Sequence, residues 1–168
     1  MLIVLSGLPG TGKTTISQLL VRKCGATYLR IDTIEQTIPP SLRTQNELST
    51  LGYVLAYEIA RANLRLGGTV VVDGVNPLSA IREAWRAVAE DSNSIIMEVE
   101  VVCTKIREHR LRVESRKADI PGHILPNWDD VQRYEYEPWS GHRVVIDSSK
   151  LSAVDAASQI VDYLELRR

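Results

Sequence analysis

A short segment near the start of the chain has the residue types and spacing needed to bind the phosphates of a nucleotide. Residues 7–15 read GLPGTGKTT, a complete GxxxxGKT pattern that directly follows an apolar run. The glycines let such a loop turn tightly, so that its backbone N–H groups point at phosphate oxygens. Lys13 is expected to reach the β and γ phosphates from a solvent-facing loop, and Thr14 to offer its hydroxyl to Mg²⁺. The expected nucleotide-binding residues are Gly7, Pro9, Gly10, Thr11, Gly12, Lys13, Thr14 and Thr15.

The alternative interpretation of this segment is a glycine-rich turn of no chemical importance. It is disfavoured because a strand-like run precedes the pattern and a helix-like segment, 13–23, follows it. The N-terminal end of that helix adds positive potential to the same anion site. We therefore expect ATP and Mg²⁺ as cofactors.

Two carboxylates follow apolar runs and are the candidates for acid–base and metal chemistry. Asp32 closes the run 28–31, and Asp73 closes the run 70–72. Phosphoryl transfer needs one group that accepts the proton of the attacking hydroxyl and another that holds Mg²⁺ or its waters. We assign the first role to Asp32 and the second to Asp73 together with Thr14. Two alternatives stay open, since Asp32 could instead cap a short helix and Asp73 could be a turn residue before Gly74.

Apolar runs alternate with segments of helical periodicity along the chain. The runs 2–5, 69–72, 95–102 and 144–146 are rich in Val and Ile and hardly alternate, which is typical of strands buried on both faces. A shorter strand is expected at 27–31, and helices are expected at 13–23, 48–66 and 80–88. This alternation predicts an α/β fold, a three-layer P-loop NTPase with a five-stranded parallel sheet and ligands at the carboxyl ends of the strands. We expect one domain, 1–168, in which Gly25 and the pair 67–68 end helices while Ser79 and Ser152 cap the following ones.

The helix expected before residue 117 carries four arginines, Arg107, Arg110, Arg112 and Arg116. Arg112 and Arg116 are four apart and hence expected on one helical face. Their spacing resembles the RxxxR of adenylate-kinase-like lids, in which the first arginine stacks on adenine and the second contacts the phosphates. The prolines and glycine of 117–127 predict a mobile flap, so we expect a lid at about 112–127. The alternative is a solvated helix face on which these arginines pair with Glu108 and Glu114.

Taken together, these motifs resemble the small P-loop kinases that include chloramphenicol phosphotransferase, gluconate kinase, zeta-type toxins and the kinase domain of phage polynucleotide kinase. The resemblance rests on GLPGTGKTT, Asp32, the segment VVVDGVNP, the arginine-rich helix before a flap and the terminal run RVVID at 143–147. It implies that Asp32 is the general base, that Asp73 lies near the metal and that Asn76 faces the acceptor. Arg30 and Arg82 are further candidates for contact with the acceptor.

Composition limits the remaining possibilities. The 168 residues carry a formal net charge of −1, which argues against a surface built mainly to hold duplex nucleic acid, so nucleic acid is possible but disfavoured as a partner. The two cysteines cannot form a disulfide framework, and the first residues predict no signal peptide, so we expect a cytoplasmic monomer or homodimer without membrane contact. No Asn-Lys-x-Asp motif of a guanine-nucleotide switch occurs, and a motor or AAA-type ATPase needs more chain than follows residue 15.

The resulting hypothesis is an ATP- and Mg²⁺-dependent kinase that phosphorylates a hydroxyl of a small molecule, with Lys13, Asp32 and Arg116 as catalytic residues. One alternative is a 5′-hydroxyl polynucleotide kinase. The other is a nucleotide-binding regulator or toxin-like protein with little turnover.

Overall fold

The computed structural model describes residues 1–39 and 48–165. Its strands are β1 (Leu2–Ser6), β2 (Thr27–Arg30), β3 (Val70–Asp73), β4 (Ile96–Val102) and β5 (Val144–Asp147). Its helices are α1 (Lys13–Cys24), α2 (Ile31–Thr37), α3 (Leu48–Arg65), α4 (Ser79–Asp91), α5 (Ile106–Ser115), α6 (Trp128–Gln132) and α7 (Ala153–Glu165).

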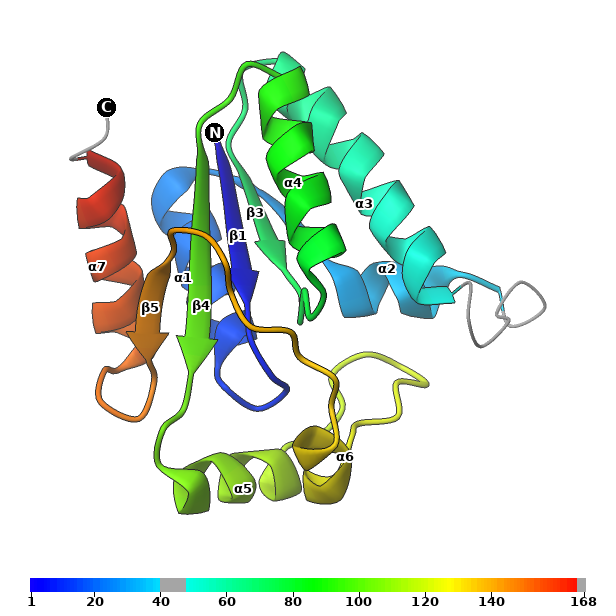
Figure 1. Cartoon of the computed structure of the whole chain (residues 1–168), viewed down its shortest axis with the longest axis vertical. Helices are drawn as coiled ribbons and strands as arrows, with labels where there is room; N and C mark the ends of the chain where they lie inside the picture. The colour runs from blue at the N-terminus through cyan, green and yellow to red at the C-terminus, as the bar shows by residue number, and fades with distance from the viewer. Residues whose placement is uncertain (40–47, 166–168) are drawn as a thin grey trace.

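The strands form one parallel sheet of five strands in the order β2-β3-β1-β4-β5 (Figure 1). This confirms the expected α/β P-loop NTPase fold. Because all the strands run the same way, their carboxyl ends share one edge of the sheet. Figure 1 shows α5, α6 and the chain between them lying across that edge.

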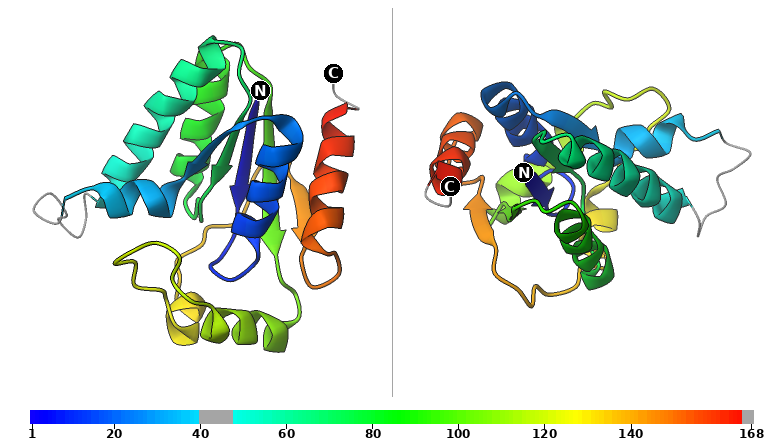
Figure 2. Two further views of the ribbon diagram at one scale, coloured as in Figure 1. Left: turned by 180° about the vertical axis from the view of Figure 1, so that it is seen from behind. Right: turned by 90° about the horizontal axis from the view of Figure 1, so that it is seen from above.

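The central strand β1 explains the layers, because alternate residues of a strand point to opposite faces. Leu2 and Val4 pack with α3 and α4, whereas Ile3 and Leu5 pack with α1 and α7. Figure 2 shows these helix pairs on the two sides of the sheet. All four side chains are 0–1 % exposed, so β1 is buried on both faces as its unbroken apolar run predicts.

Several boundaries differ from those expected. The second strand ends at Arg30, and Ile31 already begins α2, so Asp32 lies in the first turn of a helix and not at the end of a strand. Ser79 is not the expected N-cap of α4, because Leu78 occupies that position. The backbone N–H of Ser79 donates a hydrogen bond to the carboxylate of Glu137. Gly25 ends α1 in a left-handed conformation as expected, with φ 60°.

The expected cap at Ser152 is present. The Ser152 hydroxyl accepts a hydrogen bond from the backbone N–H of Asp155 at 3.1 Å, at the start of α7. Among the described residues, no helix is both long enough and apolar enough to span a bilayer.

Candidate active site

The GxxxxGKT loop connects β1 to α1, and neighbouring elements press closely on its backbone. A Cβ atom on Gly7, whose φ is +141°, would lie 2.2 Å from the carbonyl oxygen of Val101. A Cβ on Gly10 would lie 2.5 Å from a methyl group of Val113 on α5. Only glycine allows these approaches. The loop is thus held between β4 and α5 while its open side faces a cavity.

Lys13 begins α1 and is 8 % exposed, so the expectation of a solvent-facing lysine is wrong. Its Nζ donates a 2.9 Å hydrogen bond to the carbonyl oxygen of Leu8 across the loop. Burial lowers the pKa of Lys13 from 10.5 to about 8, although the nearby carboxylates of Asp73 and Asp32 act in the opposite direction. The ammonium therefore lies in a poorly hydrated place that a phosphate anion would stabilise.

Asp73 ends β3 with its side chain 3 % exposed. Its Oδ2 accepts a 2.8 Å hydrogen bond from the Tyr28 hydroxyl and lies 4.0 Å from Nε of Arg30. Thr14 lines the same cavity. A carboxylate and a hydroxyl near a phosphate site suit Mg²⁺, which takes oxygen ligands, keeps several waters and uses one or two carboxylates together with substrate phosphates. The described residues contain no cluster of three or more His, Cys, Asp or Glu side chains that would hold a metal alone.

Asp32 reaches the cavity from α2. The cap residue of α2 is Arg30, so Asp32 is not the helix cap. Its side chain is 38 % exposed, and one carboxylate oxygen lies 3.8 Å from Nε of Arg30. Asp32 is thus accessible to a ligand and lies beside a guanidinium group.

Arg30 joins the core to the loop 116–127. Its two terminal nitrogens donate hydrogen bonds of 2.5 and 3.0 Å to the carboxylate of Asp119. This pairing lowers the pKa of Asp119. Burial lowers the pKa of Arg30, but the hydrogen bond to Asp119 and the nearby carboxylates raise it, and the net effect is an increase. Bidentate pairs of this kind are the strongest ion pairs.

Arg112 and Arg116 point to different parts of the site, contrary to the expected common face. Arg112 lies in the last turn of α5, pairs with Glu108 and donates to the Ser148 hydroxyl at 2.8 Å and to its carbonyl oxygen at 3.0 Å. Arg116 is the residue after α5, with extended backbone angles. Its buried Nε has no hydrogen-bond partner among the residues that the structure describes. Burial lowers the pKa of Arg116, and the Asp32 carboxylate opposes this.

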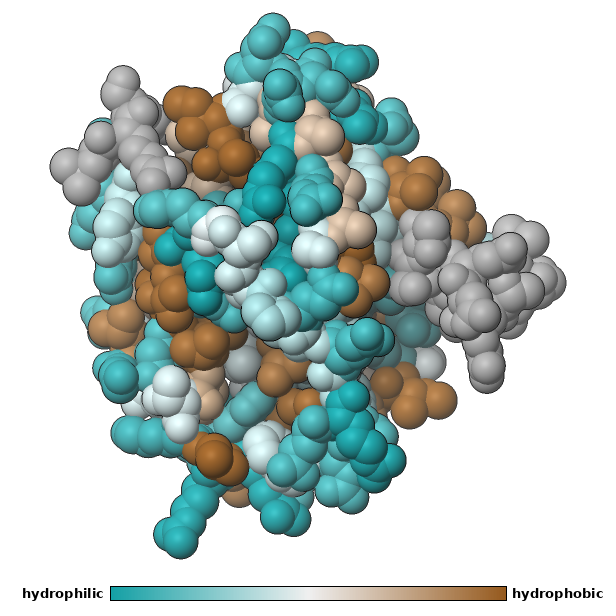
Figure 3. Space-filling model, viewed as in Figure 1, coloured by the Kyte–Doolittle hydropathy of each residue, from teal (hydrophilic) through white to brown (hydrophobic). Residues whose placement is uncertain are grey.

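These groups surround one cavity of about 750 Å³. Of the expected site residues, it is lined by Pro9, Gly10, Gly12, Lys13, Thr14, Thr15, Arg30, Asp32, Asp73, Arg112 and Arg116. Gly7 and Thr11 of the loop instead line a second cavity of about 170 Å³. Figure 3 shows mostly hydrophilic side chains over the lower part of the molecule, where α5 and α6 cover the carboxyl edge of the sheet.

Asn76 and Arg82 lie outside the lining of the large cavity. Asn76 is fully buried, where its side-chain amide donates to the Leu5 carbonyl at 3.0 Å and accepts from the Trp85 indole at 3.0 Å. Arg82 is 2 % exposed, donates to the carbonyl of Glu137 at 2.9 Å and stacks 4.4 Å from the ring centre of Trp139. The structure therefore gives both residues the environment of packing groups, in contrast to the acceptor contacts expected of them.

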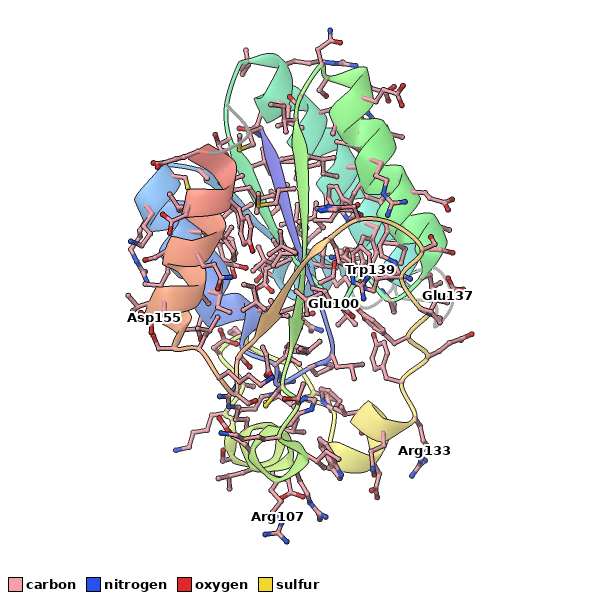
Figure 4. All side chains as sticks on the ribbon, turned by 60° about the vertical axis from the view of Figure 1, so that its left-hand side comes forward. Glu100, Arg107, Arg133, Glu137, Trp139 and Asp155 are labelled. Carbon is pink, nitrogen blue, oxygen red and sulfur yellow. The ribbon has the colours of Figure 1, made fainter. Side chains whose placement is uncertain are left out.

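Figure 4 shows Glu137 and Trp139 on the segment that runs from α6 past α4 to β5. It also shows Arg107 projecting outward from α5, away from the rest of the protein. Arg110 is likewise exposed and pairs with Glu114 on the same helix.

Three further residues lie at the cavity or beside the phosphate loop. Glu35 lies one turn after Asp32 on α2 and lines the cavity, and burial raises its pKa from 4.5 to about 7, with a further contribution from Asp32. Tyr134 lines the cavity beyond α6. The imidazole of His109 on α5 is buried and donates from Nε2 to the carbonyl oxygen of Pro9 at 2.8 Å. The sequence signal for Glu35 is its three-residue spacing from Asp32.

The glycine-rich loop with its buried lysine lies at the carboxyl edge of a parallel sheet, beside two carboxylates and below two arginines, one in the last turn of α5 and one just after it. This arrangement is that of a P-loop protein. Residues 2–129 match the family described as AAA domain, and the chain belongs to this family. No curated protein matches the chain.

Several solved structures with the same fold are described as kinases. A candidate kinase from Chloroflexus aurantiacus superposes with a TM-score of 0.76 at 19 % identity over 96 % of both chains. The Mycobacterium tuberculosis APS kinase CysC, in complex with AMPPNP and APS, gives 0.72 at 18 % identity over 98 % of this chain and 96 % of that one. A gluconokinase from Sinorhizobium meliloti gives 0.67 at 16 % identity over 98 % and 95 %. The resemblance to the small P-loop kinases is thereby confirmed at the level of fold and family.

Proposed function

We propose that this protein is an ATP- and Mg²⁺-dependent kinase of the cytoplasm that transfers the γ-phosphate to a hydroxyl of a small molecule. The observation that carries the proposal is the meeting of Lys13, Asp32 and Arg116 around one cavity. The charges of Asp32 and Arg116 both act on the pKa of Lys13, which indicates that the three groups are close in space. A phosphate held there lies between two cations and beside a carboxylate that can accept a proton.

Each residue has a separate task in this proposal. The loop N–H groups and Lys13 bind the phosphates, and Arg112 lies beside Gly12 and Ser148, where it covers the nucleotide. Asp73 and Thr14 hold Mg²⁺, which when bound neutralises phosphate charge and orients the transferred group. Asp32 accepts the proton of the acceptor hydroxyl. As it does so, the hydroxyl oxygen of the acceptor forms the new bond to the γ-phosphorus, and the bond from that phosphorus to the leaving ADP breaks. Arg116 offers its unpartnered Nε–H to the charge that develops during transfer.

A screen for ADP release tests the proposal. Sugars, nucleosides, antibiotics and oligonucleotides with a free 5′-hydroxyl are each offered with ATP and Mg²⁺ to the wild-type protein and to Lys13→Ala. We expect release that rises with one class of small acceptor and is absent in the variant. Tight ATP binding without turnover by any acceptor would contradict a kinase and favour a regulator. Turnover confined to oligonucleotides and strongly dependent on salt would identify a polynucleotide kinase instead.

A further inference from the structure

The end of the cavity that lies against α2 carries three oxygen-bearing side chains close together. Asp32 and Glu35 are three residues apart, so they share one face of α2, and both line the cavity. Tyr134 lines it too, and the charges of Glu35 and Asp32 both contribute to raising the pKa of Tyr134. The proposed transfer chemistry uses only Asp32 among the three. Glu35 and Tyr134 therefore remain to be explained.

The position of Glu35 is fixed by an unusual residue in the neighbouring helix. Gly52 lies within α3, where glycine is unfavourable because it adds chain entropy and no side-chain contact. A Cβ at Gly52 would stand only 2.5 Å from Cγ of Glu35. Glycine at this position lets α3 pack directly over Glu35. The side chain is thus covered on one side by α3 while it borders the cavity on the other.

The basic groups among the described residues that line the same end of the cavity each lie beside a carboxylate, are exposed or have another task, and one of them, His123, lies near Asp119 and acts on its pKa. Arg30 is the cation beside Asp32, and both its terminal nitrogens are hydrogen-bonded to Asp119. Arg116 is the group that our proposed function assigns to the transferred phosphate. Lys117 also lines the cavity but is exposed, where its charge is hydrated and screened. A carboxylate, sulfate or phosphate on the acceptor would face Asp32 and Glu35 without a partner, which is unfavourable.

We propose that Asp32, Glu35 and Tyr134 form an acceptor subsite for a hydroxylated compound that carries no anionic group. Asp32 binds the reacting hydroxyl, and Glu35 accepts a hydrogen bond from a second hydroxyl or an amino group of the same molecule. Tyr134 packs its ring against the acceptor and offers its hydroxyl. This inference rests on the proposed kinase function and adds the charge class of the acceptor and a specificity-determining residue, Glu35.

Sets of acceptors that share a skeleton and differ in charge test this directly. Glucose, glucosamine and gluconate form one set, and adenosine and AMP form another. Binding to the protein saturated with AMPPNP and Mg²⁺ is measured by calorimetry, and transfer by ADP release. We expect the uncharged or amino member of a set to bind at least tenfold more tightly than its anionic counterpart. Equal or tighter binding of the anionic members, or no binding by any member, overturns the inference.

This experiment separates the two proposals. A protein that does not bind AMPPNP at all contradicts the proposed function. A protein that binds AMPPNP and prefers anionic acceptors contradicts only the charge class assigned here.

Variants of the subsite give a second test. Glu35→Gln keeps the shape of the side chain and removes its charge, so it should raise KM for the preferred acceptor roughly tenfold, change kcat less and narrow the discrimination against anions. Gly52→Ala should act in the same direction by displacing Glu35, and it should have no further effect in a Glu35→Ala background. Glu83→Gln, on the exposed side of α4, is the matched control and should keep the wild-type KM and selectivity. A folded Glu35→Gln with unchanged KM and unchanged charge selectivity overturns the assignment.

Discussion

Lys13 is a buried cation within the site, and its Nζ donates a hydrogen bond to the Leu8 carbonyl of its own loop. In the free protein its pKa is lowered to about 8 by burial, and bound phosphates would raise that pKa because they favour the charged form. At a pH between the pKa of Lys13 in the free protein and its higher pKa in the complex, Lys13 must take up a proton from solution when nucleotide binds. Affinity should therefore be constant below about pH 8 and fall by up to about tenfold per unit above it.

Titrations of AMPPNP between pH 7 and pH 9.5 check this expectation, and calorimetry in buffers of different ionisation enthalpy measures the proton taken up. Lys13→Arg keeps a permanent charge and should lose the decline above pH 8, while Lys13→Ala should bind weakly throughout. The fold of Lys13→Ala should stay intact in a melting curve, because the change removes a buried cation. A wild-type affinity that is flat to pH 9.5 would contradict the role of this lysine.

Asp32 is the residue on which the proton transfer depends. Asp32→Asn keeps the size of the side chain and removes the proton acceptor. We expect nucleotide affinity to stay within a few fold while turnover falls by roughly 10² to 10⁴, the usual range for a general base. If turnover survives, Asp73 becomes the next group to examine.

The residues of the site differ in whether the neighbouring sequence is enough to predict their role. The loop 7–15 could be read directly because phosphate binding needs consecutive backbone N–H groups, and Asp73 could be placed because its strand is buried along its length. Arg82 was assigned to the acceptor because nothing within its own helix reveals that Glu137 and Trp139, more than fifty residues later, take up its guanidinium. The burial of Asn76 is likewise not evident from its neighbours along the chain, because its hydrogen-bond partners Leu5 and Trp85 lie on different elements.

At the scale of elements, α5 and the loop 116–127 form a cover that is attached to the core at several points. His109 holds the Pro9 carbonyl and packs edge-on against Trp128 at a ring separation of 5.2 Å. Arg30 holds Asp119 of the loop itself. The cover is thus joined to the phosphate loop at one end and to β2 at the other, so ligands that bind between these points can affect its motion.

We predict that the segment 117–127 is mobile without ligand and becomes ordered over nucleotide and acceptor, which would keep water from the transferred phosphate. Hydrogen exchange should slow in this segment when AMPPNP and an acceptor are added. Asp119→Asn weakens the attachment to Arg30 and should speed exchange there in the free protein, without changing exchange in β1. Equal exchange in free and bound states would identify an ordinary surface loop.

Arg116 is the part of this cover that reaches the reacting groups. Arg116→Lys keeps the charge but loses the planar fork of donors, so transfer should fall by roughly tenfold or more while ATP affinity changes little. The ratio of the effects on kcat and on nucleotide Kd measures this. An equal loss in both would place Arg116 in ground-state binding instead.

At the scale of the whole molecule, the strand order explains why the site forms. The central strands β1 and β3 end side by side, which brings the phosphate loop next to Asp73, and the neighbouring β2 leads into α2 with Asp32. The sequence indicated the strands and their parallel direction through unbroken apolar runs. It left open a short helix after Asp32 but did not indicate that the helix begins at Ile31, because Ile31 continues the apolar pattern of the strand. In the structure Ile31 packs in one cluster with α3 and α4.

The most direct measurement of this account follows the γ-phosphoryl group itself. The protein is incubated with ATP labelled with ¹⁸O at the γ-phosphate, Mg²⁺ and the acceptor selected by the screen, and the products are separated by mass spectrometry. If the proposed function is correct, we expect one labelled phosphate on an acceptor hydroxyl for each ADP formed, and loss of this product in Asp32→Asn under conditions where ATP still binds. Label found only in inorganic phosphate, or ADP formation that ignores the acceptor and Asp32, would contradict it.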